Sequence, residues 1–156
     1  MRRHTILLVA GLAALGTQCG QDGAPPPGFE QRNVTPAANG LAVTLTTDRP
    51  RYAPRQAIGV RLVLTNGGPQ EATLEFRDGQ RYDFTVTDAG GRVLWRWSAD
   101  KGFIQMIGVE VLPPQGELAY SETVPAPAEP GTYRLVGTIT AFGTALADTV
   151  QVTVAR

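Results

Sequence analysis

The side chains best suited to catalysis and metal binding are scarce in this 156-residue chain. It has one histidine, His4, and one cysteine, Cys19, and both lie near the amino terminus. Catalytic triads, His- or Cys-ligated zinc and haem ligation all depend on imidazole or thiol groups. If the amino-terminal stretch is removed or serves as an anchor, the rest of the chain has neither group. The sequence therefore predicts a protein that is not an enzyme, with no catalytic residue, no metal site and no cofactor.

Carboxylates are the remaining candidates for site chemistry. Asp78, Asp83 and Asp88 recur every five residues, which could suggest calcium binding. Their spacing differs from that of an EF-hand loop, and Asp83 falls within a predicted strand while the other two flank turns. We interpret the three as turn formers and part of a solvated strand face. No acidic pair stands out for glycoside hydrolysis.

Two tryptophans and an arginine are stronger candidates, for binding rather than catalysis. Trp95 and Trp97 lie two apart, so they share one face of a strand and Arg96 takes the other. Both tryptophans would fit the core of a β-sandwich. If the strand instead ends near Ser98, Trp97 lies at an edge and joins Arg96 as a binding anchor, since tryptophan and arginine are frequent at binding hot spots.

The segment from Ser98 to Gly108 follows directly and has the weakest strand pattern in the body of the chain. We predict that it is a recognition loop whose binding residues are Arg96, Trp97, Lys101 and Phe103. The alternative is that Phe103 and Ile104 plug one end of the fold. A substrate-like inhibitor loop must be exposed, extended and rigid, because preorganisation limits the entropy lost on binding.

Strands must position these residues. Apolar and polar residues alternate from residue 41 onward, and no stretch has the period of an amphipathic helix. The predicted strands are 41–46, 58–64, 72–76, 82–87, 93–97, 109–112, 118–124, 133–142 and 145–154. Turns rich in Gly and Pro separate them, and the turn at 88–91 closes a hairpin. The pattern predicts an all-β, immunoglobulin-like antiparallel β-sandwich of about eight or nine strands, with a closed barrel as the main alternative.

One tyrosine favours the sandwich over the barrel. The sequence Pro130-Gly131-Thr132-Tyr133 places Tyr133 at the start of a late strand, where sandwiches often have a tyrosine corner. A half-buried strand tyrosine explains the same position equally well.

The first 39 residues differ in composition from the rest. Arg2 and Arg3 precede an apolar run at 6–15 that is short for a membrane span, which is typical of a secretory signal peptide. We therefore predict a signal peptide at 1–19, a Gly/Pro-rich tether at 20–39 and a folded domain at 40–156. The predicted location is exported: secreted, or lipid-anchored in the cell envelope.

Cys19 decides between those two destinations. It stands where the lipidated cysteine of a bacterial lipoprotein would stand, although Gly16 and Gln18 depart from the usual lipobox. Lipid attachment at Cys19 and cleavage after Gly16 fit the sequence equally well. With 14 basic and 14 acidic residues the formal net charge is zero, so we expect no nucleic-acid partner and no membrane contact except through this anchor.

Residues 79–105 read GQRYDFTVTDAGGRVLWRWSADKGFIQ. This stretch closely resembles the bacterial intracellular proteinase inhibitor family BsuPI, and the likeness continues at Leu112-Pro113, Gly116-Glu117, Tyr120 and Pro130-Gly131-Thr132-Tyr133. The resemblance implies an immunoglobulin-like domain whose partner is a protein, a serine proteinase. Two features depart from the family. The stretch from Pro113 to Glu117 is looser than the family's tight Pro-Gly-Glu turn, and predicted export would separate the chain from an intracellular target.

Two functions therefore fit the sequence. The first is a non-catalytic protein-binding module, exported or lipid-anchored, that inhibits a proteinase. The alternative is a structural or accessory β-sandwich domain of the cell envelope with no inhibitory activity.

Overall fold

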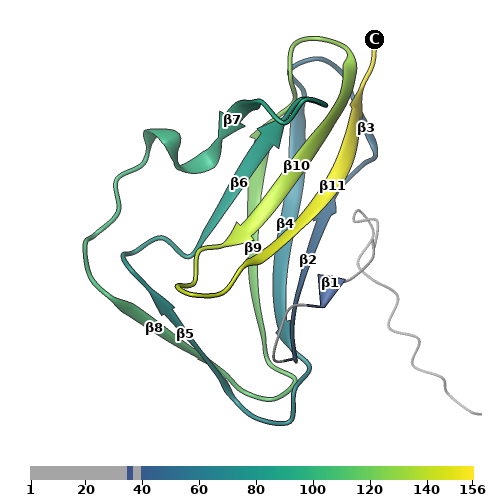
Figure 1. The fold of residues 1–156 in the computed structure, drawn as a ribbon. Helices are drawn as coiled ribbons and strands as arrows, with labels where there is room; N and C mark the ends of the chain where they lie inside the picture. The colour runs from purple at the N-terminus through teal and green to yellow at the C-terminus, as the bar shows by residue number, and fades with distance from the viewer. Residues whose placement is uncertain (1–34, 37–39) are drawn as a thin grey trace, which may run out of the picture.

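A computed structural model of the chain describes residues 35–36 and 40–156, which are built almost entirely of strands (Figure 1). In chain order the elements are β1 (Thr35–Pro36), β2 (Leu41–Thr47), β3 (Arg51–Tyr52), β4 (Ala57–Asn66), β5 (Ala72–Phe76), β6 (Tyr82–Thr87), β7 (Val93–Arg96), the 3-10 helix η2 (Trp97–Asp100), β8 (Gly108–Leu112), β9 (Glu117–Pro125), β10 (Gly131–Ile139) and β11 (Leu146–Val154). The predicted signal peptide, most of the predicted tether and Cys19 lie outside the described residues.

The strands form two sheets that pack face to face. One sheet has the order β1-β2-β4-β9 and the other the order β3-β11-β10-β6-β7. All neighbouring strands are antiparallel except β3, which runs parallel to β11. Alternate residues of the strands point inward, and on β4 the buried apolar residues are Ile58, Val60, Leu62 and Leu64. The prediction of an all-β immunoglobulin-like sandwich is confirmed.

The sheets remain separate, so the barrel alternative is wrong. On one lateral side, β2 meets β11, and a backbone-to-side-chain bond joins them: the Leu45 N–H donates to Asp148 Oδ2 at 2.8 Å. The two sheets lie close together at Gly137, where a Cβ would be 2.7 Å from a methyl carbon of Leu62. The opposite side, where β9 faces β6 and β7, carries the candidate site described below.

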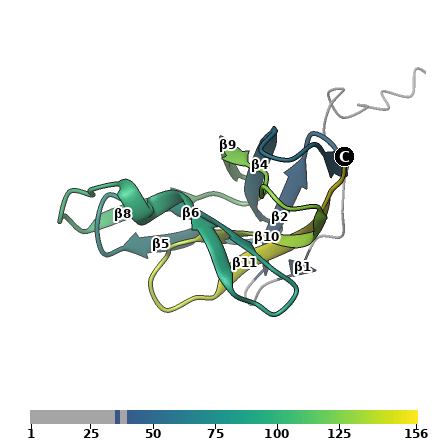
Figure 2. The same ribbon diagram turned by 90° about the horizontal axis from the view of Figure 1, so that it is seen from above.

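A two-stranded ribbon, β5 paired with β8, projects beyond the two sheets (Figures 1 and 2). Its inner face buries Leu74 and Phe76 against the core. Buried Asn66 ties the ribbon to β4 through its side-chain amide, which donates to the carbonyl oxygens of Gln70, Leu112 and Pro113. The sequence at 113–117 nevertheless closes tightly, since the Gly116 N–H donates to the carbonyl oxygen of Pro113 at 2.9 Å.

Tyr133 forms a tyrosine corner, one of the two alternatives that the sequence left open. The residue is buried, and its hydroxyl donates to the carbonyl oxygen of Glu129 at 2.7 Å. This bond reaches back to the backbone a few residues upstream, as in other sandwiches.

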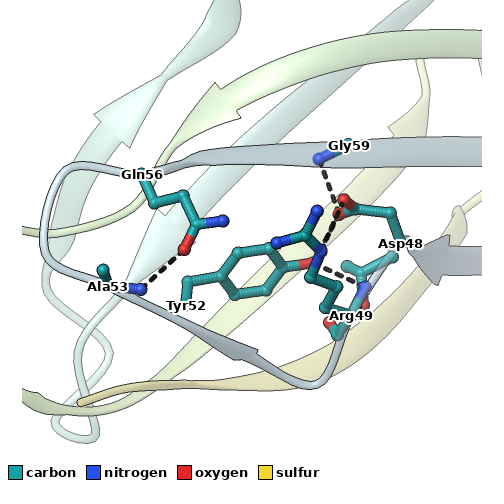
Figure 3. Close-up of polar contacts among 7 residues, drawn as sticks. Asp48, Arg49, Tyr52, Ala53, Gln56 and Gly59 are labelled. Carbon is teal, nitrogen blue, oxygen red and sulfur yellow. Dashed lines mark hydrogen bonds and ion pairs between the residues drawn. The ribbon is translucent and has the colours of Figure 1, made fainter. Parts of the chain in front are cut away.

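A polar cluster at the end of the sandwich away from the ribbon is shown in Figure 3. The buried Tyr52 hydroxyl donates to Asp48 Oδ1 at 2.6 Å and accepts the Arg49 N–H at 2.9 Å, and the same carboxylate oxygen accepts the Gly59 N–H at 2.9 Å. Nearby, the Ala53 N–H donates to Gln56 Oε1 at 2.8 Å. Burial, followed by the bond to Asp48, raises the pKa of Tyr52. The cluster joins β2, β3 and β4, and its bonds are internal to the fold.

Candidate protein-binding site

The hairpin of β6 and β7 leads directly into the candidate site. β7 ends at Arg96, and Trp97 begins η2 instead of continuing the strand. Asp83 on β6 supports this change, since its carboxylate accepts the Ser98 N–H at 3.2 Å and the Ser98 hydroxyl at 2.7 Å. These bonds hold the first turn of η2 against the edge of the sheet. The interpretation of Asp83 as part of a solvated strand face is therefore wrong, whereas Asp78 and Asp88 do form turns, accepting the Gln80 and Arg92 N–H groups.

A row of aromatic rings connects η2 to the core. Ring centroids of Tyr120 on β9 and Tyr82 on β6 are 4.5 Å apart, those of Tyr82 and Trp97 are 4.6 Å apart, and those of Trp97 and Phe103 are 6.1 Å apart. Such distances are typical of favourable aromatic pairs. The row crosses from one sheet to the other and then out to the segment after η2. It therefore gives that segment a rigid base.

A hydrogen bond between a phenol and a carboxylate fixes the inner part of the row. The Tyr82 hydroxyl donates to Glu122 Oε1 at 2.6 Å, which again bridges the two sheets. Burial and then this bond raise the pKa of Tyr82, and burial raises the pKa of Tyr120. Both hydroxyls are therefore neutral at physiological pH.

An open groove of about 590 Å³ lies between β7, η2 and β9. The four predicted binding residues lie around this groove or beside it. Arg96, Trp97 and Lys101 line the groove. The Lys101 Nζ lies 4.6 Å from the centroid of the Trp97 ring, a cation–π contact, and the Phe103 ring also contacts Trp97, with its centroid 6.1 Å away. Arg96 is exposed, and its Nε lies 3.9 Å from Asp83 Oδ2. Trp97, Lys101 and Phe103 are thus brought together, while Arg96 is drawn toward Asp83.

The two expectations for the tryptophans each hold in part. Both are half-buried and pack against the core, but Trp97 has left the strand and lies at the edge. Phe103 is half-buried, whereas Ile104 is 74% exposed, so the alternative in which both plug one end of the fold is wrong.

Sequence reasoning missed Asp83, Tyr82 and Tyr120 as supports of the site. Their roles depend on contacts across strands and sheets. The signals that the sequence carried were the inward alternation of Tyr82 with Phe84 and the place of all three residues in the resemblance to the family. Within the described ranges, no cluster of three or more His, Cys, Asp or Glu side chains is arranged to hold a metal ion. None of the helical turns in that part of the chain has the length and hydropathy needed to cross a membrane.

Solved structures similar to the chain share its fold. The C-terminal domain of wzt is 12% identical with a TM-score of 0.51, and the match covers 84% of this chain and 83% of that one. Spo0M, a sporulation control protein from Bacillus subtilis, is 12% identical with a TM-score of 0.50, and the match covers 75% of this chain and 50% of that one. This chain thus spans half the length of the Spo0M structure. Among curated proteins, no sequence matches the chain significantly.

The model of one protein family matches residues 45–143, more than half of the chain, and its description is "BsuPI: Intracellular proteinase inhibitor". The match includes η2 and the segment that follows it. It also corrects the predicted location: export is wrong, because the family is intracellular and this points to the cytoplasm. The physical reason is that a charged start and a short apolar run are features of composition alone, which discriminate less than a match along residues 45–143. The chain belongs to the BsuPI family of intracellular proteinase inhibitors.

Proposed function

We propose that the protein is a non-catalytic inhibitor that binds a proteinase of the serine class through η2 and the segment after it. Arg96, Trp97, Lys101 and Phe103 are the proposed contact residues. The observation that carries the proposal is the contact of Trp97 with both Lys101 and Phe103, at 4.6 Å and 6.1 Å from its ring. Through Trp97, a surface-exposed segment is fastened to the aromatic row and hence to the core.

Rigidity of this kind favours binding. A loop that is already ordered loses less conformational entropy when it meets a partner. The segment has no disulfide to order it, since the chain contains a single cysteine. Two hydrogen bonds that Ser98 donates to the Asp83 carboxylate and the ring contacts of Trp97 supply the order instead.

Inhibition can be tested with the full chain and a panel of bacterial serine proteinases, with a cysteine proteinase and a metalloproteinase included to test the class. We expect stoichiometric loss of hydrolysis for at least one serine proteinase. Lys101→Ala should raise the inhibition constant by about 10-fold or more, the effect of removing an important interface residue. Arg134→Ala, which removes an exposed charge from β10, is the matched control and should leave the inhibition constant unchanged. Undiminished hydrolysis at excess protein would contradict the proposal.

A structural role without inhibition is the second candidate, and β8 favours it. This strand pairs with β5 alone in the described part of the chain, and Val109 and Val111 on it are each 55% exposed. An apolar strand at a sheet edge is a template for pairing with another protein. If every proteinase in the panel hydrolyses its substrate at the normal rate, this second function gains support.

A further inference from the structure

Three of four consecutive side chains after Phe103 are large, apolar and exposed. Ile104 is 74% exposed, Met106 is 66% exposed and Ile107 is 74% exposed. Soluble proteins rarely leave such side chains together in water unless the surface binds something. The remaining residue of this segment, 104–107, is Gln105, so the segment carries no charge.

The start of the segment is held by the backbone. The Ile104 carbonyl oxygen accepts the Gly79 N–H at 2.8 Å and the Met106 N–H at 3.0 Å. The first bond fastens the segment to the turn before β6, and the second folds the chain tightly around Gln105. Phe103, immediately before, rests against Trp97.

The segment ends where β8 begins, at Gly108, which pairs with Phe76 on β5, and Arg81 packs over this residue. The Arg81 Nη1 donates to the Asp78 carbonyl oxygen at 2.8 Å and its Nε to Glu110 Oε1 at 3.2 Å. The guanidinium packs so closely on Gly108 that a Cβ at that residue would be 2.2 Å from Nη2. The segment is thus exposed in its side chains and ordered at both ends, which limits the entropy lost on binding, and it is turned at Gln105 rather than extended along its whole length.

Within the segment, the three apolar side chains differ in their surroundings. Ile104 sits at the first anchor, and Ile107 lines a shallow pocket of about 250 Å³ together with Phe142 and Arg77. Met106 lies between them, and its unbranched side chain adapts to an apolar cavity of irregular shape.

We propose that Met106 enters the primary substrate pocket of the target proteinase, flanked by Ile104 and Ile107, and that the target is a serine proteinase whose primary pocket is apolar. This inference rests on the proposed inhibitory function. The neutral, apolar character of the segment fits a hydrophobic pocket, whereas a pocket with a carboxylate at its base would select an arginine or lysine at this place.

The test measures inhibition constants of full-length variants against subtilisin and chymotrypsin, whose primary pockets accept apolar side chains, and against trypsin, whose pocket is acidic. Met106→Asp should weaken inhibition of the first two enzymes at least 100-fold. Met106→Leu should stay within about 3-fold, because volume-conserving apolar changes are tolerated best. Met106→Arg should weaken inhibition of the first two enzymes and introduce inhibition of trypsin.

Ala128→Asp is the matched control, since it places the same charge on an exposed apolar side chain in the turn between β9 and β10, outside the segment. It should leave the inhibition constants unchanged. Because Met106 is largely exposed, its variants should keep the circular dichroism spectrum and the unfolding midpoint of the unmodified chain.

The outcomes separate this inference from the function on which it rests. If the unmodified chain inhibits and both Met106→Asp and Met106→Arg match it on all three enzymes, the contact lies elsewhere and the inference is overturned while the inhibitory function stands. Equal weakening by Ala128→Asp would also overturn it. If the unmodified chain inhibits none of the serine proteinases, in this set or in the wider panel, the proposed function fails and the inference fails with it.

Discussion

Gly108 offers a sharp test of how the segment after η2 is anchored. The residue is buried, and a Cβ there would lie 2.2 Å from Arg81 Nη2, 2.7 Å from Cζ and 2.8 Å from Nη1. These are all atoms of one guanidinium, which is itself held by Asp78, by Glu110 and by the Phe76 ring at 4.5 Å. Gly108→Ala must therefore displace the guanidinium and break these contacts.

The expected loss follows from the contacts. A partly exposed cation–π contact contributes about 0.5–1 kcal/mol, a partly exposed ion pair about 0.2–1 kcal/mol and a hydrogen bond about 0.5–1.5 kcal/mol. The alanine recovers about 0.5 kcal/mol because it restricts the unfolded chain. We therefore expect Gly108→Ala to lower the free energy of unfolding by about 1–3 kcal/mol.

Urea denaturation of the full chain, followed by tryptophan fluorescence, measures the change. Gly102→Ala is the matched control, since a Cβ at Gly102 meets nothing within 4 Å, and its free energy of unfolding should be unchanged or slightly higher. The double variant Arg81→Ala with Gly108→Ala should be no less stable than Arg81→Ala alone, because the clash is gone. Additive losses in the double variant, or a Gly108→Ala protein as stable as Gly102→Ala, would refute the reasoning.

Three further predictions concern the frame that carries the site. Asn66→Ala removes three donated hydrogen bonds from a buried amide, so urea denaturation should show a loss of about 2–4 kcal/mol; a loss below 0.5 kcal/mol would mean that the amide does not tie the ribbon to β4. Tyr133→Phe removes only the bond to Glu129 and should cost about 0.5–1.5 kcal/mol with an unchanged m-value; no loss in urea would contradict a stabilising tyrosine corner. The raised pKa of Tyr52 means that the folded state binds its proton more tightly than the unfolded state, whose tyrosine pKa is about 10; this stability is complete below pH 10 and is lost as the pH rises toward the folded pKa. The free energy of unfolding should therefore fall as the pH rises above about 10, and Tyr52→Phe should flatten the fall; equal slopes for the two proteins would show that Tyr52 is not responsible.

The alternation of side chains was enough to predict an all-β fold, because a period of two places every second residue on the buried face of a sheet, but it left a closed barrel open beside the sandwich. The same local logic predicted the hairpin of β6 and β7, whereas for Tyr133 it left a corner and an ordinary strand position open, and the bond to Glu129 decides for the corner. The end of β7 was harder to locate: Trp97 continues the alternation in sequence but begins η2 in the structure. The reason lies in Asp83, a residue of the neighbouring strand that binds Ser98.

The composition of the segment after η2 is plain in the sequence, and so was its weak strand pattern. Tertiary structure alone decided which of its side chains face water. Phe103 turns toward Trp97, while Ile104, Met106 and Ile107 remain exposed, because the backbone of Ile104 is bound to Gly79 and the close packing of Arg81 holds Gly108. These partners are many residues away along the chain, and a local pattern records the preference of each residue but not the distant atoms that decide between burial and exposure.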